Sequence, residues 1–172
     1  MRHSIAAVSL LVLAAGCQSI PPDAPKASAT LEPTKGSTVR GTASFVQLGD
    51  KVRVTASITG LKPGSEFGFH IHEAGDCSSG DGMSAKGHFN PYAKQHAHSG
   101  TPERHAGDLP SLKSDASGNA SVTADLDVIT VTAGQGSVID RGLIVHAQAD
   151  DFKTQPTGNA GARSACAVIK AG

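Results

Sequence analysis

Residues 51–59 read KVRVTASIT, and apolar side chains alternate with polar ones along the whole stretch. A period of two with one apolar face is typical of an antiparallel strand that is buried on one side only. The apolar set consists of Val52, Val54, Ala56 and Ile58. The preceding run, Val39 to Leu48, is also strand-like, and Gly49-Asp50 between the two runs is a short hairpin signal. The stretch therefore predicts a β-hairpin as the centre of the fold.

Further strand candidates extend on both sides of this hairpin. They are Ala27–Glu32, Glu66–His72, Leu109–Ser114, Ala120–Leu126, Gly142–His146 and Ala165–Lys170. About eight short strands separated by turn residues favour an all-β fold, an antiparallel Greek-key barrel or sandwich. The two connections Glu73–Asp108 and Ala147–Arg163 are long for structureless loops, so we expect a metal and a disulfide to hold them.

The composition agrees with a single small β domain and excludes some partners. The chain has 172 residues with 20 Gly and 9 Pro but only 5 Phe and 1 Tyr, which favours turns and short strands. It carries 15 basic and 15 acidic residues, so no basic surface points to nucleic acid. No apolar run approaches the roughly 20 residues of a membrane-spanning helix.

The N-terminal region is predicted to be an export signal followed by a tether. A positive start at Arg2 precedes a short apolar stretch, and small residues stand before Cys17. We assign residues 1–16 to a signal peptide and residues 17–34, rich in Pro, to a lipidated Cys17 with its linker. The domain then spans residues 35–172, unless its first strand begins near residue 27. The pattern before Cys17 resembles the lipobox of bacterial lipoproteins; the alternative is an ordinary signal peptide cleaved near Ala15.

Two cysteines remain after Cys17, and they form an even pair in a chain predicted to be exported. Cys77 and Cys166 are expected to form a disulfide, because exported proteins mature in oxidising compartments. The alternative is two buried free thiols.

Histidine is the outlier in the composition, with six of the eight between Phe67 and Asp108. His70 and His72 fall in a predicted strand, where alternate residues share a face. Two histidines at this spacing, without other ligands, are often exposed surface residues. Here further candidate ligands follow: His88, His96, His105, Asp108 and His146. Imidazole suits copper and zinc, and one carboxylate among histidines suits zinc. Seven candidates exceed the needs of one tetrahedral ion, so the sequence predicts two ions.

Five motifs in order give this chain its resemblance to a known family. They are Phe67 to His72 (FGFHIH), Gly87 to Pro91 (GHFNP), Arg104 to Leu109 (RHAGDL), Leu143 to His146 (LIVH), and Gly158 to Arg163 (GNAGAR) leading to Cys166. Over residues 28–171 the chain resembles the copper,zinc superoxide dismutases. Cys77, five residues after His72, is similar to the bacterial periplasmic branch. The resemblance implies an eight-stranded Greek-key barrel and an enzyme that converts superoxide to dioxygen and hydrogen peroxide.

The same resemblance implies one copper and one zinc ion per subunit and a role for each candidate ligand. Copper would be held by His70, His72, His88 and His146. Zinc would be held by His88, His96, His105 and Asp108, with His88 bridging the two ions and serving in catalysis. Asp150 would link the free ring nitrogens of His70 and His96. Arg163 would stand beside the copper, where the superoxide anion docks.

Several residues near these motifs remain open. His98 is an alternative to His96 as a zinc ligand, although the spacing along the sequence from Phe89-Asn90-Pro91 favours His96. Lys86 stands where bacterial relatives carry a small residue and reads equally well as an exposed loop cation. Lys153 is either a steering charge or a plain solvated side chain. Three glycines mark either close backbone approaches or turns and bulges: Gly41, Gly68 and Gly107.

Other functions compete with the dismutase. A copper carrier would bind the metals without turnover, although Arg163 would then have no use. A zinc hydrolase built on His70 and His72 would need a general base, and Glu73 would point to the opposite face of the strand. A structural lipoprotein would leave the histidine spacing unexplained. We expect an envelope protein, in the periplasm and lipid-anchored to the outer membrane. The sequence leaves open whether it is a monomer or a homodimer, for which Val138 and Ile139 are interface or core candidates.

Overall fold

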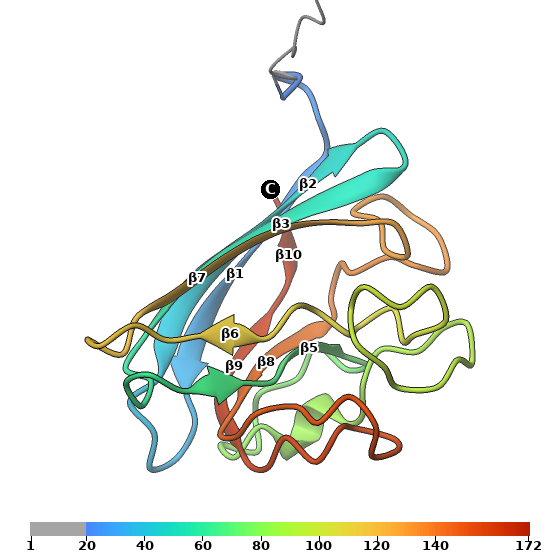
Figure 1. Ribbon diagram of the computed structural model, residues 1–172. Helices are drawn as coiled ribbons and strands as arrows, with labels where there is room; N and C mark the ends of the chain where they lie inside the picture. The colour runs from blue at the N-terminus through green and yellow to red at the C-terminus, as the bar shows by residue number, and fades with distance from the viewer. Residues whose placement is uncertain (1–19) are drawn as a thin grey trace, which may run out of the picture.

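The computed structural model describes residues 20–172, and its regular structure is almost entirely antiparallel β-strand (Figure 1). The predicted signal peptide and Cys17 lie outside the described residues. Within residues 20–172, no helix is long and apolar enough to span a membrane. The elements are β1 (Lys26–Pro33), β2 (Arg40–Leu48), β3 (Lys51–Thr59), β4 (Glu66–Phe67), β5 (Phe69–His72), the 3-10 helix η1 (Met83–Ala85), β6 (Leu112–Lys113), β7 (Ala120–Leu126), β8 (Gly142–His146), β9 (Arg163–Val168) and β10 (Lys170–Ala171).

The predicted hairpin is confirmed as β2 and β3. Leu48 pairs with Lys51, so Gly49 and Asp50 alone connect the two strands. The four alternating apolar residues of β3 are buried, and its remaining residues are exposed or partly exposed. Alternation in the sequence thus becomes one face in the core and one face in solvent.

The strands form one curled antiparallel sheet with a two-stranded sheet across its open side (Figure 1). The order in the large sheet is β5-β8-β9-β1-β2-β3-β7, with β10 beside β1, and β4 pairs with β6. The chain passes from the small sheet to the large one at Gly68, between β4 and β5. A Cβ there would lie 2.8 Å from the Ala160 Cβ, so only glycine fits. The predicted all-β barrel class is confirmed.

Three predicted segments differ clearly from the observed elements. Glu66–His72 is two strands, broken at Gly68, and Leu109–Ser114 shrinks to Leu112–Lys113 after Pro110, which has no N–H to donate. The last strand starts earlier, at Arg163, and breaks at Ile169, which bonds to the main chain of Arg141 instead. β1 covers Lys26–Pro33, which agrees with the strand candidate Ala27–Glu32 and with a first strand that begins near residue 27. Small alanines, together with Leu31, suffice to bury one face of β1.

Contacts between distant segments hold the two long loops, residues 73–108 (the first long loop) and residues 147–162 (the second long loop). The predicted disulfide is confirmed: Cys77 in the first long loop is bonded to Cys166 in β9. Val138 is fully buried and Ile139 packs against the core, so both contribute to the core of this chain. The predicted close approaches are also confirmed, since a Cβ at Gly41 or Gly107 would lie 2.3 Å or less from a backbone oxygen.

Candidate metal centre

Two neighbouring strands position three of the predicted ligands. His70 and His72 lie in β5, which pairs with β8 so that His70 is opposite Ile144. His146 ends β8, and its Nε2 lies 3.3 Å from Nε2 of His72. All three side chains are buried. Regular strand pairing therefore brings together imidazoles that are separated by more than seventy residues in the sequence.

The first long loop continues the sheet beyond β5 and so delivers two further residues. Phe89 N–H donates to the carbonyl of Ile71, and Ile71 N–H donates to the carbonyl of Gly107. A Cβ at Gly107 would lie 2.2 Å from that Ile71 oxygen, so this close approach requires glycine. The result is that His88 pairs across from His72 and Asp108 across from His70.

The first group of candidate ligands consists of four buried histidines: His70, His72, His88 and His146. One donor atom from each lies within 4.8 Å of the others. Nδ1 of His70 and Nε2 of His88 are buried and have no hydrogen-bond partner among residues 20–172. A buried polar atom without a partner is costly, and a metal ion would satisfy both atoms. The donor set therefore fits a metal that accepts imidazole, such as copper.

Hydrogen bonds fix which ring nitrogen of each histidine faces the centre. Nε2 of His70 donates to Asp150, Nδ1 of His72 donates to the carbonyl of Lys86, and Nδ1 of His146 donates to the carbonyl of Gly161. The opposite nitrogen of each ring then carries a lone pair.

Burial, aided by the neighbouring imidazoles, lowers the pKa of His146 to about 3 and that of His72 well below its usual range. Burial also lowers the pKa of His88 to about 4, against the pull of Asp108. The lowered pKa values keep the rings of His72, His88 and His146 neutral, as metal binding requires.

The second group contains three histidines and a carboxylate: His88, His96, His105 and Asp108. Oδ1 of Asp108 lies 3.0 Å from Nδ1 of His88, 2.9 Å from Nδ1 of His96 and 3.5 Å from Nδ1 of His105. Ligands of a tetrahedral zinc at ordinary bond lengths are about 3.3 Å apart. Although burial opposes it, hydrogen bonds from these histidines hold the Asp108 pKa well below its usual range. Three nitrogens and one carboxylate oxygen fit zinc, and His88 belongs to both groups.

Asp150 links the two groups by hydrogen bonds to one histidine of each. Its Oδ2 lies 2.7 Å from Nε2 of His70, and its Oδ1 lies 2.9 Å from Nε2 of His96. The side chain is buried at the start of the second long loop, and a Cβ at Gly158 would lie 1.9 Å from Oδ1. Burial opposes charge on His96, but the hydrogen bonds to Asp108 and Asp150 raise its pKa to about 9. One carboxylate thus orients a ring in each group.

The structure places His96, rather than His98, in the second group. The exposed His98 accepts a hydrogen bond from Gly100 N–H, and its ring packs edge-on against Phe152 at 4.9 Å between centroids. Sequence reasoning missed Gln155, whose side-chain amide makes two hydrogen bonds of 2.8 Å with the backbone N–H and C=O of His96. A glutamine in an exposed loop gives no sequence signal for such a contact.

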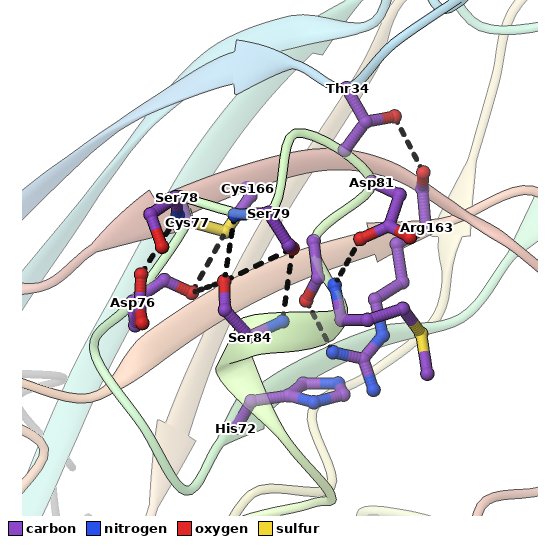
Figure 2. The surroundings of a disulfide bond; sticks show 12 residues. Thr34, His72, Asp76, Cys77, Ser78, Ser79, Asp81, Ser84, Arg163 and Cys166 are labelled. Atoms are coloured by element: carbon purple, nitrogen blue, oxygen red, sulfur yellow. Dashed lines mark hydrogen bonds between the residues drawn. A yellow bond between two sulfur atoms is a disulfide. The ribbon is translucent and has the colours of Figure 1, made fainter.

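Arg163 lies beside the first group, at the start of β9 (Figure 2). Its Nη1 donates to the carbonyl of Gly82 and its Nη2 to the carbonyl of Lys86, the carbonyl that His72 also contacts. Partial burial lowers the Arg163 pKa, but an arginine retains its charge. The ammonium of Lys86 is exposed, 3.7 Å from Glu73, and the Lys153 side chain is also exposed.

Comparison with known proteins agrees with this geometry. A family model described as copper/zinc superoxide dismutase (SODC) matches residues 39–169. The chain is 40% identical to "Superoxide dismutase [Cu-Zn] 2" of Aquifex aeolicus (strain VF5), over 84% of this chain and 86% of that relative. It is also 40% identical to "Superoxide dismutase [Cu-Zn]" of Paramecium bursaria Chlorella virus 1, over 76% and 72%. Among solved structures, the clock protein EA4 is 38% identical with a TM-score of 0.77, over 90% of this chain and 98% of that one.

Proposed function

The chain belongs to the copper/zinc superoxide dismutase family and is a superoxide dismutase, and we propose that its two histidine groups divide copper and zinc between them. His70, His72, His88 and His146 hold the copper. His88, His96, His105 and Asp108 hold the zinc. The observation that carries this assignment is the position of His88: its Nε2 has no partner in the described part of the chain, while its Nδ1 faces Asp108 at 3.0 Å.

The overall reaction consumes two superoxide ions and two protons and yields dioxygen and hydrogen peroxide. Copper supplies the one-electron exchange, because it changes oxidation state and zinc does not. His88 holds and delivers a proton at Nε2, which faces the first group. Its Nδ1 stays fixed beside Asp108, so the ring keeps its place when the proton moves. Asp150 holds Nε2 of both His70 and His96, so Nδ1 of each ring faces its own group.

Arg163 captures the substrate. Superoxide is a small anion, and a guanidinium presents paired donors to such an ion. The carbonyls of Gly82 and Lys86 accept hydrogen bonds from this guanidinium. Figure 2 shows the guanidinium next to His72. A fixed charge here raises the local concentration of anions and orients them toward the first group.

The test is the rate of superoxide removal by residues 18–172 loaded with copper and zinc, against a zinc-only preparation. Fast removal that requires copper and is blocked by cyanide supports the assignment. Binding of both metals without turnover contradicts it and favours a copper carrier. Replacing Arg163 by Ala should slow turnover several-fold and weaken its dependence on salt while copper stays bound.

We also propose that the enzyme acts in the cell envelope, in the periplasm and attached to the outer membrane through a lipid on Cys17. The apolar stretch before Cys17 and the Pro-rich spacer behind it support this placement, as does the disulfide, which persists in oxidising compartments. There it protects the envelope from superoxide. Expression of the full chain and of Cys17→Ser in a Gram-negative host tests the anchor. Wild type should fractionate with membranes and the variant should be soluble; equal fractionation contradicts lipidation at Cys17.

A further inference from the structure

Thr34 makes a partly buried contact with the main chain of Arg163, although 129 positions separate the two residues. Its hydroxyl donates a hydrogen bond of 2.6 Å to the carbonyl oxygen of Arg163 (Figure 2). The residue is only 8% exposed. Thr34 follows directly after β1 and opens the turn that leads to β2. A residue far from both histidine groups in sequence thus touches the residue that captures the substrate.

This hydroxyl extends the strand pairing by one residue. β1 and β9 pair through Glu32 with Cys166 and Pro33 with Ala165, and Thr34 N–H then donates to the carbonyl of Ser164 at 3.1 Å. Beyond that point the backbone of β1 turns away, and the Thr34 side chain supplies the next contact, to Arg163. On the other edge of β9, the register with β8 shifts between Val145 and His146, and His146 is the residue opposite Arg163. Thr34 therefore holds the main chain of Arg163 at the point where the regular pairing of β9 with β1 and with β8 is interrupted.

The same turn also contacts the loop whose carbonyl oxygens bind the guanidinium of Arg163. Lys35 N–H donates to the carbonyl of Gly80 at 2.8 Å. Gly80 lies two residues before Gly82, whose carbonyl accepts from Nη1 of Arg163. The residues after β1 thus contact both the main chain of Arg163 and the segment that supplies an acceptor for its side chain.

We propose that Thr34 is a positioning residue for Arg163 and so sets the efficiency of superoxide capture; this rests on the proposed role of Arg163. Without the hydroxyl, the partly buried carbonyl of Arg163 loses its donor from Thr34, and the start of β9 shifts to find another. The guanidinium then no longer meets both backbone acceptors in one geometry. Small displacements of a substrate-orienting group lower rate without abolishing it.

The experiment compares Thr34→Val, which removes the hydroxyl at nearly constant volume, with Thr34→Ser, which keeps it. Thr38→Val is the matched control, because Thr38 ends the same turn and its hydroxyl donates to the carbonyl of Gly60 at 3.3 Å, away from Arg163. Two readouts are measured: kcat/KM for superoxide across ionic strength, and the Nε–H resonance of Arg163 by NMR in the zinc-loaded, copper-free protein. Thr34→Val should lower kcat/KM about three-fold, reduce its salt dependence, and shift the Arg163 resonance. Thr34→Ser and Thr38→Val should match wild type.

A Thr34→Val protein with wild-type kcat/KM and an unmoved Arg163 resonance overturns the proposal. If Thr34→Val does not fold, Thr34→Ala removes the same hydroxyl with a smaller side chain and is judged by the same readouts. If Arg163→Ala itself has the wild-type rate, the capture role of Arg163 fails. The NMR comparison then decides whether Thr34 still positions Arg163.

Discussion

The two histidine groups share His88 but are built in opposite ways. The first group takes three of its four members from strands β5 and β8, and two of its nitrogens have no partner among the residues that the structure describes. The second group takes all its members from the first long loop, and its donors converge on Oδ1 of Asp108. One group has donor atoms without partners and the other is closed by a carboxylate. The difference suits the first for a reacting ion and the second for a structural one.

Electrostatics separates the groups in the same way. Burial, aided by His70 and His88, lowers the pKa of His146 to about 3, whereas two carboxylates raise the pKa of His96 to about 9 in spite of burial. Arg163 adds a positive charge beside the first group. An anionic substrate is therefore drawn to the first group, and the anionic ligand Asp108 belongs to the second.

Removing one ligand from each group should give the largest contrast. His146→Ala should lose copper and all measurable activity while keeping zinc, because His146 touches only the first group. His105→Ala should lose zinc and keep copper with reduced activity, because His88 loses its support. Metal content after dialysis and the rate of superoxide removal check both variants. Loss of both metals from either variant would show that the groups are not separable.

The metal-free protein should be destabilised in acid by the first group and in alkali by the second. Unfolded histidines take up protons near pH 6.5, but folded His88 and His146 resist until about pH 4 and 3. Their contribution to stability is present above pH 6.5 and falls as the pH drops below it. The raised pKa of His96 gives stability that is full below pH 6.5 and is lost as the pH rises through about 9.

Urea unfolding of the metal-free protein at pH values from 4.5 to 9.5 measures this profile. We expect a maximum near pH 6.5 and a loss of a few kcal/mol on the acid side. His146→Ala should flatten the acid side alone. His98→Ala, exposed and outside both groups, is the control and should leave the profile unchanged. A profile that is flat from pH 4.5 to 6.5 would contradict the buried, neutral state of the first group.

Gln155 offers a way to loosen only the second group. Gln155→Met removes both hydrogen bonds to the backbone of His96 at similar volume, so zinc affinity should fall about ten-fold with copper retained. Gln135→Met is the matched control, because Gln135 also holds the first long loop but donates to the carbonyl of Pro91, which is no ligand. Competition with a zinc chelator measures both. Equal zinc loss from the two variants would assign the effect to general loosening of the loop.

The smallest effect is expected at Lys86, whose carbonyl contacts both His72 of the first group and Arg163. Its backbone has φ 63° and ψ −146°, a conformation suited to glycine, yet its carbonyl serves both His72 and Arg163. Lys86→Gly should raise stability by about 1 kcal/mol with little change in rate, since the carbonyl remains. Lys86→Ala should not be stabilised. Urea unfolding of the two variants distinguishes relief of backbone strain from loss of the side chain.

The sequence predicted the regular strands and the histidines well, because each carries a local signal. Strict alternation placed β3 at its observed bounds, and five motifs marked the residues that the structure gathers into two groups. The first strand was also predicted to within one residue at each end, as Ala27–Glu32 against Lys26–Pro33. Thr34 and Gln155 had no signal, because their partners lie 129 and 59 residues away. Contacts of that kind depend on the completed fold.

The most direct measurement is a crystal structure of the copper- and zinc-loaded protein with anomalous data collected at both absorption edges. The proposed metal assignment predicts copper among His70, His72, His88 and His146. It predicts zinc among His88, His96, His105 and Asp108, with His88 between the two ions. Zinc in the first group with copper in the second, or a single ion touching both, would contradict the account.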